Sequence, residues 1–451
     1  MVEDIRFHRL PRRTFVGMGV AGAAALALPV SLRNARAQDV TEVRLTQSPS
    51  SPAEQNVMTS LLATFMAQHP DIQVNYEPVT QQYNTKLQTD LAAGTAADVF
   101  TFGSLPSPDF IQGGVLAPLN DRMAAAGITT DQFYPGLIAA FQQGEELYGL
   151  PKDFSTLGMI YDPAIFATPT DTSTVIGGTP SASPAASPAA SPAASPVAGE
   201  GLAVPTTWDE LRTVATQLRD QTGQAPIVFG PSFDRYIAFL YQGGGSVISE
   251  DGTSIVIDTP EALAALDFYH GLYVDGLATT FTEVGAQWPG DAFAKGLASI
   301  VFEGPWLIGF MAENAPNKPY GIAEMPAGPA GKATMAFTEA YGLNAASDVQ
   351  DAAFTLIAWL TGVEGMTQWS TGFGVLPSRP EVAAVYLEQF PEREPFLVGG
   401  EYARPWQLGS GGERFNTEAN AELQALFAGQ QDSATTLANM QARAEEIIRL
   451  G

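Results

Sequence analysis

The segment that decides the fold is residues 42–102, EVRLTQSPSSPAEQNVMTSLLATFMAQHPDIQVNYEPVTQQYNTKLQTDLAAGTAADVFTF. Alternating apolar residues predict three short strands in it, at 42–46, 72–76 and 98–102. Apolar residues at helical spacing predict two helices between these strands, at 52–69 and 83–93. The order strand, helix, strand, helix, strand predicts an α/β fold with a mostly parallel sheet covered by helices.

Local signals mark the ends of both helices. Ser51 is followed by Pro52 and, three residues after the serine, by Glu54, which is typical of a capping box with proline at the first helical position. Pro70 and Gly94 are expected to end the two helices.

The composition excludes several classes of protein. The 451 residues, enough for two or three domains, include no cysteine, so disulfides, thiolate metal sites and cysteine nucleophiles are excluded. Asp and Glu outnumber Lys and Arg by 48 to 22, a net charge of −26, which disfavours nucleic acid and anionic membranes as partners. Of three histidines, His69 and His270 lie in helical patterns and are expected to be structural. We therefore expect neither a metal nor a cofactor.

The first 37 residues have the pattern of an export signal. The pair Arg12-Arg13 precedes the apolar stretch Gly17–Val30, and the sequence Ala-Arg-Ala at 35–37 offers a small-x-small cleavage site. The two arginines are typical of a twin-arginine signal, although Pro11 stands where Ser or Thr is commoner. An ordinary secretory signal and a membrane anchor are the alternatives. We expect an exported protein, periplasmic or at the cell surface, that is soluble after cleavage near Ala37.

Residues 168–203 differ in composition from the rest of the chain. Within them, Ser181–Pro196 contains only Ser, Ala and Pro, with proline at every fourth position. Such a stretch cannot bury a core, so we expect a disordered insertion. It is interpreted as a tolerated expansion of a surface loop, and a spacer or glycosylation target is the alternative. Order is expected to resume at Thr207-Trp208-Asp209-Glu210, a second capping box.

Six motifs follow one another along the chain. They are YNTKL with LAAGTAADV at 83–99, GVLAPL at 114–119, YGLPKD with IYD at 148–162, PTTWDEL at 205–211, AFAKG with EGPW at 292–306, and GVLPSR at 374–379. In this order they resemble the motifs of the extracellular solute-binding proteins of ABC importers, in the maltose-binding-protein-like family. Ala97 departs from the family pattern, in which proline is commoner at that position.

The resemblance implies a two-lobed, periplasmic-binding-protein-like α/β fold, in which each lobe has a mostly parallel sheet flanked by helices and the ligand cleft lies between the lobes. The expected segments are 38–152 and 342–376 for the first lobe, 157–336 and 378–451 for the second lobe, and the insertion 168–203 on the second lobe. Crossovers between the lobes are expected near 151–156, 337–341 and 376–379. The resemblance also implies that a monomer closes around its solute and delivers it to the transmembrane subunits of a permease.

Sugar recognition needs apolar faces for the C–H side of a pyranose and fixed polar groups for its hydroxyls. By resemblance, Trp306 is the stacking position and Asp153 the acidic position after the crossover proline. The second crossover, with Glu339 and Tyr341, is likewise implied by the resemblance. The residues alone add loop positions, the end of the third strand, which is where parallel sheets place ligands, and the start of the second helix. The full set of candidate ligand-binding residues is Trp306, Trp288, Asp153, Glu303, Ser104, Phe102, Glu339, Tyr341 and Tyr83.

Other functions remain open at this point. A polyamine would suit the carboxylates of Asp153, Glu303 and Glu339, and a polyol is a further alternative. Glu303 with Glu339 or Asp153 could also make a glycoside hydrolase, but the resemblance indicates binding without catalysis. Few Lys and Arg adjoin the crossovers, which disfavours anionic solutes, and residues 48–51 lack the aromatic or charged residues expected for long maltodextrins. We therefore expect a mono- or oligosaccharide as the solute.

Overall fold

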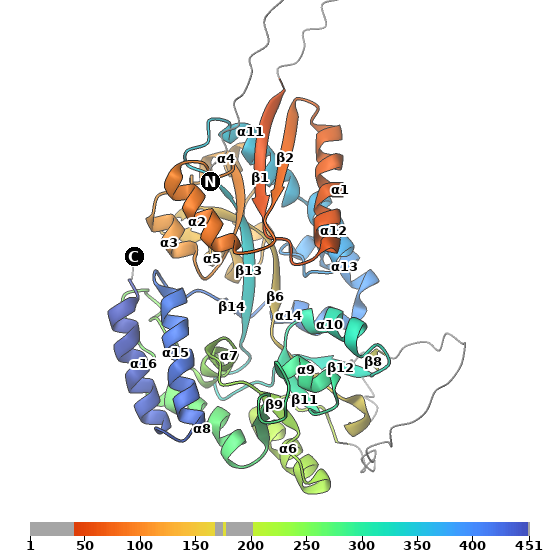
Figure 1. The fold of residues 1–451 in the computed structure, drawn as a ribbon, viewed down its shortest axis with the longest axis vertical. Coiled ribbons are helices and arrows are strands. Elements are labelled where there is room, and N and C mark those ends of the chain that lie inside the picture. The colour runs from red at the N-terminus through yellow and green to blue at the C-terminus, as the bar shows by residue number, and fades with distance from the viewer. Residues whose placement is uncertain (1–39, 167–174, 177–201, 450–451) are drawn as a thin grey trace, which may run out of the picture. The chain divides into compact units, whose positions relative to one another are not determined.

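The computed structural model describes residues 40–166, 175–176 and 202–449. The predicted export signal and the Ser181–Pro196 stretch lie outside these residues. Two six-stranded sheets form the centres of two lobes, and long strands run from one lobe to the other (Figure 1). Within the described ranges, no helix is long and apolar enough to cross a membrane.

The first lobe is built on the strands β1 (Thr41–Gln47), β2 (Ile72–Pro78), β3 (Val99–Gly103), β6 (Gly149–Thr156), β13 (Thr334–Leu343) and β14 (Ala403–Pro405). Their order is β14-β13-β3-β1-β2, and β6 pairs with β13 outside this path. The three predicted strands are confirmed, and β1 is parallel to both β2 and β3. Because β13 enters this sheet from the other lobe, it runs antiparallel to β3 and makes the sheet mixed.

Helices cover this sheet on both faces. They are α1 (Pro52–Gln68), α2 (Tyr83–Ala93), α3 (Ser107–Gln112), α4 (Asn120–Ala126), α5 (Pro135–Ala139), α11 (Gln350–Leu360) and α12 (Val363–Phe373), and a small hairpin joins β4 (Gln142–Gln143) to β5 (Glu146–Leu147). The core contains Leu45, Phe65, Phe100 and Trp369, all at most 2% exposed. Residues 350–373, far along the chain, therefore complete the lobe that residues 40–150 begin.

The start of α1 follows the prediction in one half of its capping box. The Ser51 hydroxyl accepts a hydrogen bond of 3.2 Å from the backbone N–H of Glu54, as expected for an N-cap. The Glu54 carboxylate does not return to the Ser51 N–H; it accepts from the backbone N–H of Ser50 at 2.6 Å and from Nε2 of Gln47 at 2.9 Å. Glu54 thus connects the start of α1 to Gln47, the last residue of β1. At the other helix, Gly94 ends α2 with a φ of 69°, as predicted.

The second lobe contains the strands β7 (Gly158–Tyr161), β8 (Val175–Ile176), β9 (Ile227–Phe229), β10 (Ala278–Thr280), β11 (Ile300–Glu303) and β12 (Tyr320–Ala323). Their order is β10-β9-β11-β7-β12-β8. The strands β10, β9 and β11 are parallel, whereas β7, β12 and β8 add antiparallel pairs. This sheet is therefore mixed, not mostly parallel. Strand β8 also lies inside the segment 168–203, which was expected to be disordered throughout.

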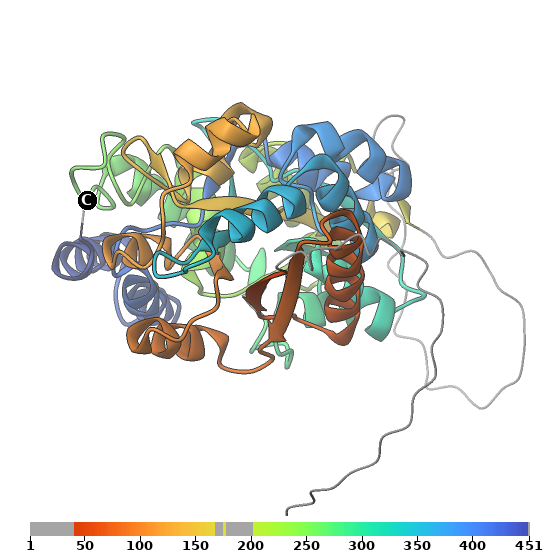
Figure 2. The same cartoon turned by 90° about the horizontal axis from the view of Figure 1, so that it is seen from above.

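The helices of the second half of the chain are α6 (Trp208–Thr222), α7 (Phe233–Gly243), α8 (Pro260–Val274), α9 (Pro289–Ala294), α10 (Trp306–Asn314), α13 (Ala383–Gln389), α14 (Glu394–Gly399), α15 (Gly412–Phe427) and α16 (Ser433–Ile447). Both views show α15 and α16 side by side (Figures 1 and 2). Together with α7 and α8 they enclose a core rich in aromatic side chains, including Phe229, Phe239 and Tyr269.

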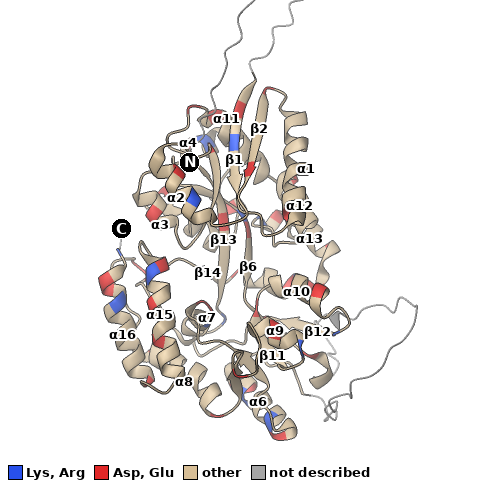
Figure 3. Ribbon diagram, viewed as in Figure 1, with Lys and Arg blue, Asp and Glu red and all other residues tan. Residues whose placement is uncertain are grey.

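Charged side chains are spread over the helices of both lobes, and Lys and Arg occur singly in this view without forming a basic face (Figure 3). This distribution agrees with the acidic composition, which disfavours nucleic acid as a partner.

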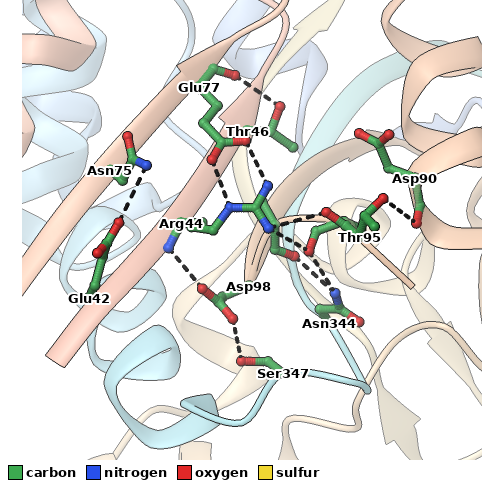
Figure 4. A network of polar contacts seen from close by, with 12 residues as sticks. Glu42, Arg44, Thr46, Asn75, Glu77, Asp90, Thr95, Asp98, Asn344 and Ser347 are labelled. Atoms are coloured by element: carbon green, nitrogen blue, oxygen red, sulfur yellow. Dashed lines mark hydrogen bonds and ion pairs between the residues drawn. The ribbon is translucent and has the colours of Figure 1, made fainter. Parts of the chain in front are cut away.

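A polar network fixes the strands of the first lobe to one another (Figure 4). The Arg44 guanidinium on β1 donates to both oxygens of Glu77 on β2, at 2.7 and 3.0 Å. The backbone N–H of Arg44 donates to Asp98 at 2.8 Å, and the other oxygen of Asp98 accepts from Ser347 at 2.7 Å. Asp98 belongs to the AADV motif, so the acid of that motif ties the start of β3 to β1 and to the segment after β13.

Strands β6 and β13 connect the two lobes, and their paired segment is called the hinge below. They pair antiparallel from Ala336 opposite Thr156 to Gly342 opposite Gly149. The register shifts between Glu339 and Ala340, so that Lys152 is an extra residue on β6, a β-bulge. Beyond β6 the chain continues into β7 of the second sheet. A bridge from Phe154 to Leu376 places the predicted 376–379 segment beside the same hinge.

Candidate functional site

A cavity of about 290 Å³ lies where the carboxyl end of β3 meets the hinge. Its lining residues are Gly103, Ser104, Leu105 and Pro106 after β3, Asp153 and Ser155 on β6, Phe337, Thr338 and Glu339 on β13, and Trp406 just after β14. Strands β3, β6 and β14 all pair with β13. The cavity is therefore placed at the point where the two lobes are joined.

The polar wall of the cavity is created by the bulge in β6. Adjacent strand residues normally point to opposite faces, and a bulge changes that direction. Here Lys152 Nζ lies 2.5 Å from Oδ2 of Asp153 and 3.5 Å from Oε2 of Glu339. The Lys152 side chain is only 5% exposed, whereas that of Glu339 is 45% exposed. One buried cation is thus shared between two carboxylates, of which Glu339 is open to a ligand.

The electrostatics of this wall keep the lysine charged. Burial by itself would lower the pKa of Lys152, but the neighbouring carboxylates of Asp153 and Glu339 hold it above its ordinary value. The ammonium group lies 4.8 Å from the ring centre of Trp369, which adds a cation–π contact. Trp369, which its helical pattern assigns to the core, is 2% exposed and also donates from Nε1 to Oδ2 of Asp153 at 2.8 Å. The orientation of Asp153 is therefore set from two sides.

Another part of the cavity lining is aromatic. Phe337 and Trp406 line the cavity, with ring centres 6.1 Å apart. Trp306, at the start of α10, meets the ring of Phe337 edge to face at 5.5 Å and 79°. Trp306 is 36% exposed, which is unusual for a side chain of this size in contact with other aromatics. Phe337 and Trp406 thus form an aromatic wall of the cavity, whereas Trp306 adjoins this wall through Phe337 and is not itself among the residues that line the cavity.

Glu303 was expected to contact the ligand, but its side chain lies buried inside the second lobe. It is fully buried, and its carboxylate accepts from Arg235 at 2.9 and 3.3 Å and from Trp306 Nε1 at 2.8 Å. Burial raises the pKa of Glu303, and the bonds from Arg235 and Trp306 oppose this rise. Its oxygens are therefore used by protein donors, so Glu303 supports the aromatic wall instead of facing a solute.

The other predicted residues divide into two groups. Ser104, Asp153 and Glu339 line the cavity, and Tyr83 lies nearby, where its hydroxyl donates to the carbonyl of Thr101 in β3 at 2.7 Å. Phe102 and Tyr341 do not line it; both are 2% exposed and belong to the core of the first lobe. They lie on opposite faces of the sheet, because Phe102 pairs with Ala340, the neighbour of Tyr341, and helices cover both faces.

Trp288 is placed away from the cavity lining. It precedes α9, and its ring packs against Phe310 of α10 at 5.0 Å and over the backbone of Gly290. The breaker-rich loop correctly indicated that Trp288 lies outside a regular helix, but its ring fills a gap between two helices of the second lobe.

Sequence reasoning did not select Trp406, Thr338, Ser155, Lys152 or Arg235. Trp406 follows Arg404 and Pro405, a breaker context like that of Trp288, and that is the one local signal that could have found it. Arg235 carries no such signal, because it lies 68 positions from Glu303. Across the described ranges, no group of three or more His, Asp or Glu side chains could hold a metal ion.

Comparison with known proteins agrees with this architecture. Residues 49–367 match the bacterial extracellular solute-binding protein family. A Brucella abortus protein named as a binding protein is 25% identical over 446 residues, which cover 95% of this chain and 97% of that one. The maltotriose-binding protein of Pyrococcus abyssi is 24% identical over 343 residues, 73% of this chain and 65% of that one.

The structure of a cyclic alpha-maltosyl-1,6-maltose binding protein from Arthrobacter globiformis has the same fold, with a TM-score of 0.75 at 21% identity over 91% of this chain and 100% of that one. The predicted two-lobed fold and the predicted family are thereby confirmed. This chain belongs to the bacterial extracellular solute-binding protein family and is a binding protein, not an enzyme.

Proposed function

We propose that this protein captures a neutral mono- or oligosaccharide at the hinge cavity and, as a monomer, delivers it to the permease of an ABC importer. The observation that carries the proposal is that one cavity is lined both by two aromatic rings, Phe337 and Trp406, and by the carboxylates of Asp153 and Glu339. A pyranose has one apolar C–H face and a rim of hydroxyls, so it can pack on the rings while its hydroxyls donate to the carboxylates.

The charge of the site favours an uncharged solute. Lys152 and Arg235, which contact residues of the cavity lining, are each paired with carboxylates. An anionic solute would therefore bring its charge toward the carboxylates of Asp153 and Glu339, which line the cavity. Phosphorylated or acidic solutes are the poorest fit to this arrangement.

A polyamine fits less well than the sequence alone suggested. Of the three acids expected to hold it, Glu303 is buried and paired with Arg235, and Asp153 and Glu339 share Lys152. A polyamine would have to approach the Lys152 ammonium group to reach either remaining acid, which costs like-charge repulsion. A sugar can use the same acids as hydroxyl acceptors and Lys152 as a donor.

The comparisons support the sugar class. The names of the Pyrococcus abyssi relative and of the Arthrobacter globiformis structure refer to malto-oligosaccharides. The export-signal pattern at residues 1–37 supports capture outside the cytoplasm. Closure of the two lobes about β6 and β13 would enclose the solute and produce the form that the permease accepts.

The proposal is tested by a thermal-shift screen of the purified protein against glucose, maltose, maltotriose, a cyclic gluco-oligosaccharide, glycerol, spermidine and glycerol 3-phosphate. A true solute at one hundred times its Kd stabilises the fold by about 2.7 kcal/mol. We expect a neutral sugar to raise Tm and to be recovered unchanged. A shift with spermidine or glycerol 3-phosphate alone would overturn the sugar class, and conversion of the sugar to a product would overturn the binding function.

A further inference from the structure

We propose that Arg235 is a positioning residue that sets the ring of Trp306 against Phe337, so that the aromatic wall is already in place before a solute arrives. The inference rests on the proposed function, because it takes Trp306 as part of the surface that contacts the solute.

The Glu303 carboxylate links Arg235 to Trp306. Arg235 lies in the first turn of α7 and donates from two nitrogens, one to each oxygen of Glu303, at 2.9 and 3.3 Å. The indole N–H of Trp306 donates to one of the same oxygens at 2.8 Å. Bonds to an ionised acceptor are the strong ones, and the planar guanidinium holds the carboxylate in one orientation. The polar edge of the indole is therefore fixed by a partner that Arg235 itself fixes.

Arg235 also contacts the ring directly. Its guanidinium carbon lies 5.2 Å from the ring centre of Trp306 and 5.9 Å from that of Phe337. Since the two rings meet at 79°, the guanidinium occupies the corner between them. A Cβ atom at Gly304 would lie 2.2 Å from the indole, so only glycine lets the ring fold back over this turn. Arg235 and Gly304 cover part of Trp306, and its remaining exposed surface is available to a solute.

Stability alone is a poor reason for an arginine at this position. A cation in the first turn of a helix opposes the helix dipole, and a buried ion pair contributes little more than well-packed apolar residues would. The Arg235 side chain is 17% exposed and requires a second acid, Asp234 at 2.7 Å, beside Glu303. What this costly arrangement provides is a fixed geometry for two aromatic rings that come from different elements, α10 and the hinge strand β13.

The consequence concerns affinity. A half-exposed tryptophan without these contacts would sample several rotamers, and ordering it on binding would weaken the complex. Loss of the contacts that Arg235 makes with Glu303 and Trp306 should therefore reduce affinity for the solute by about tenfold, although Arg235 itself does not touch the solute.

The ring position can be measured without any solute. In protein labelled with 15N in its tryptophans, the Trp306 indole N–H signal is assigned by its loss in Trp306→Phe. In Arg235→Met we expect this signal to shift and to exchange faster with water, because the Glu303 acceptor is no longer held. Arg235→Lys, which retains the charge but not the planar fork, should give a smaller shift.

Arg212→Met is the matched control, since it removes another second-lobe arginine that pairs with Asp275 at the surface. An unchanged Trp306 signal in folded Arg235→Met would overturn the inference.

The effect on binding is tested by a double-mutant cycle with maltotriose as the probe, or with the best sugar of the screen. Arg235→Met should weaken binding about tenfold in the wild-type background and not at all in Trp306→Ala, because the ring that it positions is gone. An equal loss in both backgrounds, or no loss in either, would overturn the inference. If no sugar binds the wild-type protein, the proposed function fails, and the indole signal alone then decides the role of Arg235.

Discussion

The indole nitrogen of Trp369 on α12 lies 2.8 Å from Oδ2 of Asp153 on the hinge strand β6, although the two residues are 216 positions apart. Asp153 is thus held by a helix of the first lobe on one side and by Lys152 on the other. A carboxylate with both partners fixed presents its remaining oxygen to the cavity in one orientation, which is the condition for selective recognition of a hydroxyl.

Removing this bond should weaken sugar binding. Trp369→Phe keeps the buried ring but loses the donor, so Asp153 gains freedom and the fold loses a charge-assisted hydrogen bond worth about 1.5–3 kcal/mol. We expect an affinity loss of several-fold by titration calorimetry. Trp359→Phe is the control, because its indole donates to Gln68 at the surface of the same lobe. If the two variants bind equally well, Asp153 does not depend on Trp369.

Trp288 and Trp406 should differ in their effect on binding. Trp406→Ala removes part of the cavity wall and should weaken sugar binding by more than tenfold, and it should also lower stability, because Trp406 is 7% exposed and packs in the core. Trp288→Ala removes a ring that packs against Phe310 outside the cavity lining, so it should lower the free energy of unfolding by about 3 kcal/mol and leave affinity unchanged below Tm. Loss of affinity in Trp288→Ala at equal folded fraction would return Trp288 to the site.

Glu303→Gln should be far more destabilising than a surface substitution of the same kind. It leaves the buried Arg235 guanidinium with Asp234 as its remaining acid, and breaking a buried pair costs about 3–5 kcal/mol. Asp275→Asn, which breaks the surface pair with Arg212, should cost less than about 1 kcal/mol. Urea unfolding midpoints of the two variants measure the difference, and equal midpoints would contradict a structural role for Glu303.

Glu283 should contribute to acid sensitivity. Hydrogen bonds to its carboxylate lower the pKa of Glu283 from 4.5 to about 2. The backbone N–H of Thr280 has the largest effect, and the hydroxyls of Tyr273 and Thr279 have smaller ones. Because the folded-state pKa is the lower one, this contribution is present above pH 4.5 and is lost as the pH falls toward 2. We expect the stability difference between wild type and Glu283→Gln to shrink over that range. A difference that stays constant from pH 7 to pH 3 would argue against these bonds.

The Ser181–Pro196 stretch should be dispensable for folding and binding, but the part of the chain that can be deleted is shorter than the whole segment 168–203. Val175–Ile176 pair with Tyr320 and Gly321 of β12, and Leu202 bridges to Phe166. Deleting residues 178–200 and joining the ends with a short Gly/Ser linker should leave Tm and sugar affinity unchanged. Deleting residues 170–200 instead should lower Tm, because it removes β8 from the second sheet.

Much of the fold could be predicted because it depends on neighbours in sequence. Spacing, caps and turn residues act within a few positions of the chain. They predict the helix start at Ser51, the helix end at Gly94 and the order of strands and helices along residues 42–102. For the same reason Ser104 could be found, since residues after a strand of a parallel sheet lie at its binding edge.

The sequence by itself therefore determined the elements of residues 42–102, their order along the chain and the edge of the sheet where the candidate cavity lies. Only the tertiary structure decided which side chains meet there. The bulge at Lys152 turns adjacent residues toward one wall, Phe102 and Tyr341 turn into the core, and Glu303 is taken by Arg235 from a helix distant in the chain. Such choices depend on register and on packing between segments far apart in sequence, and no local pattern of residue types encodes them.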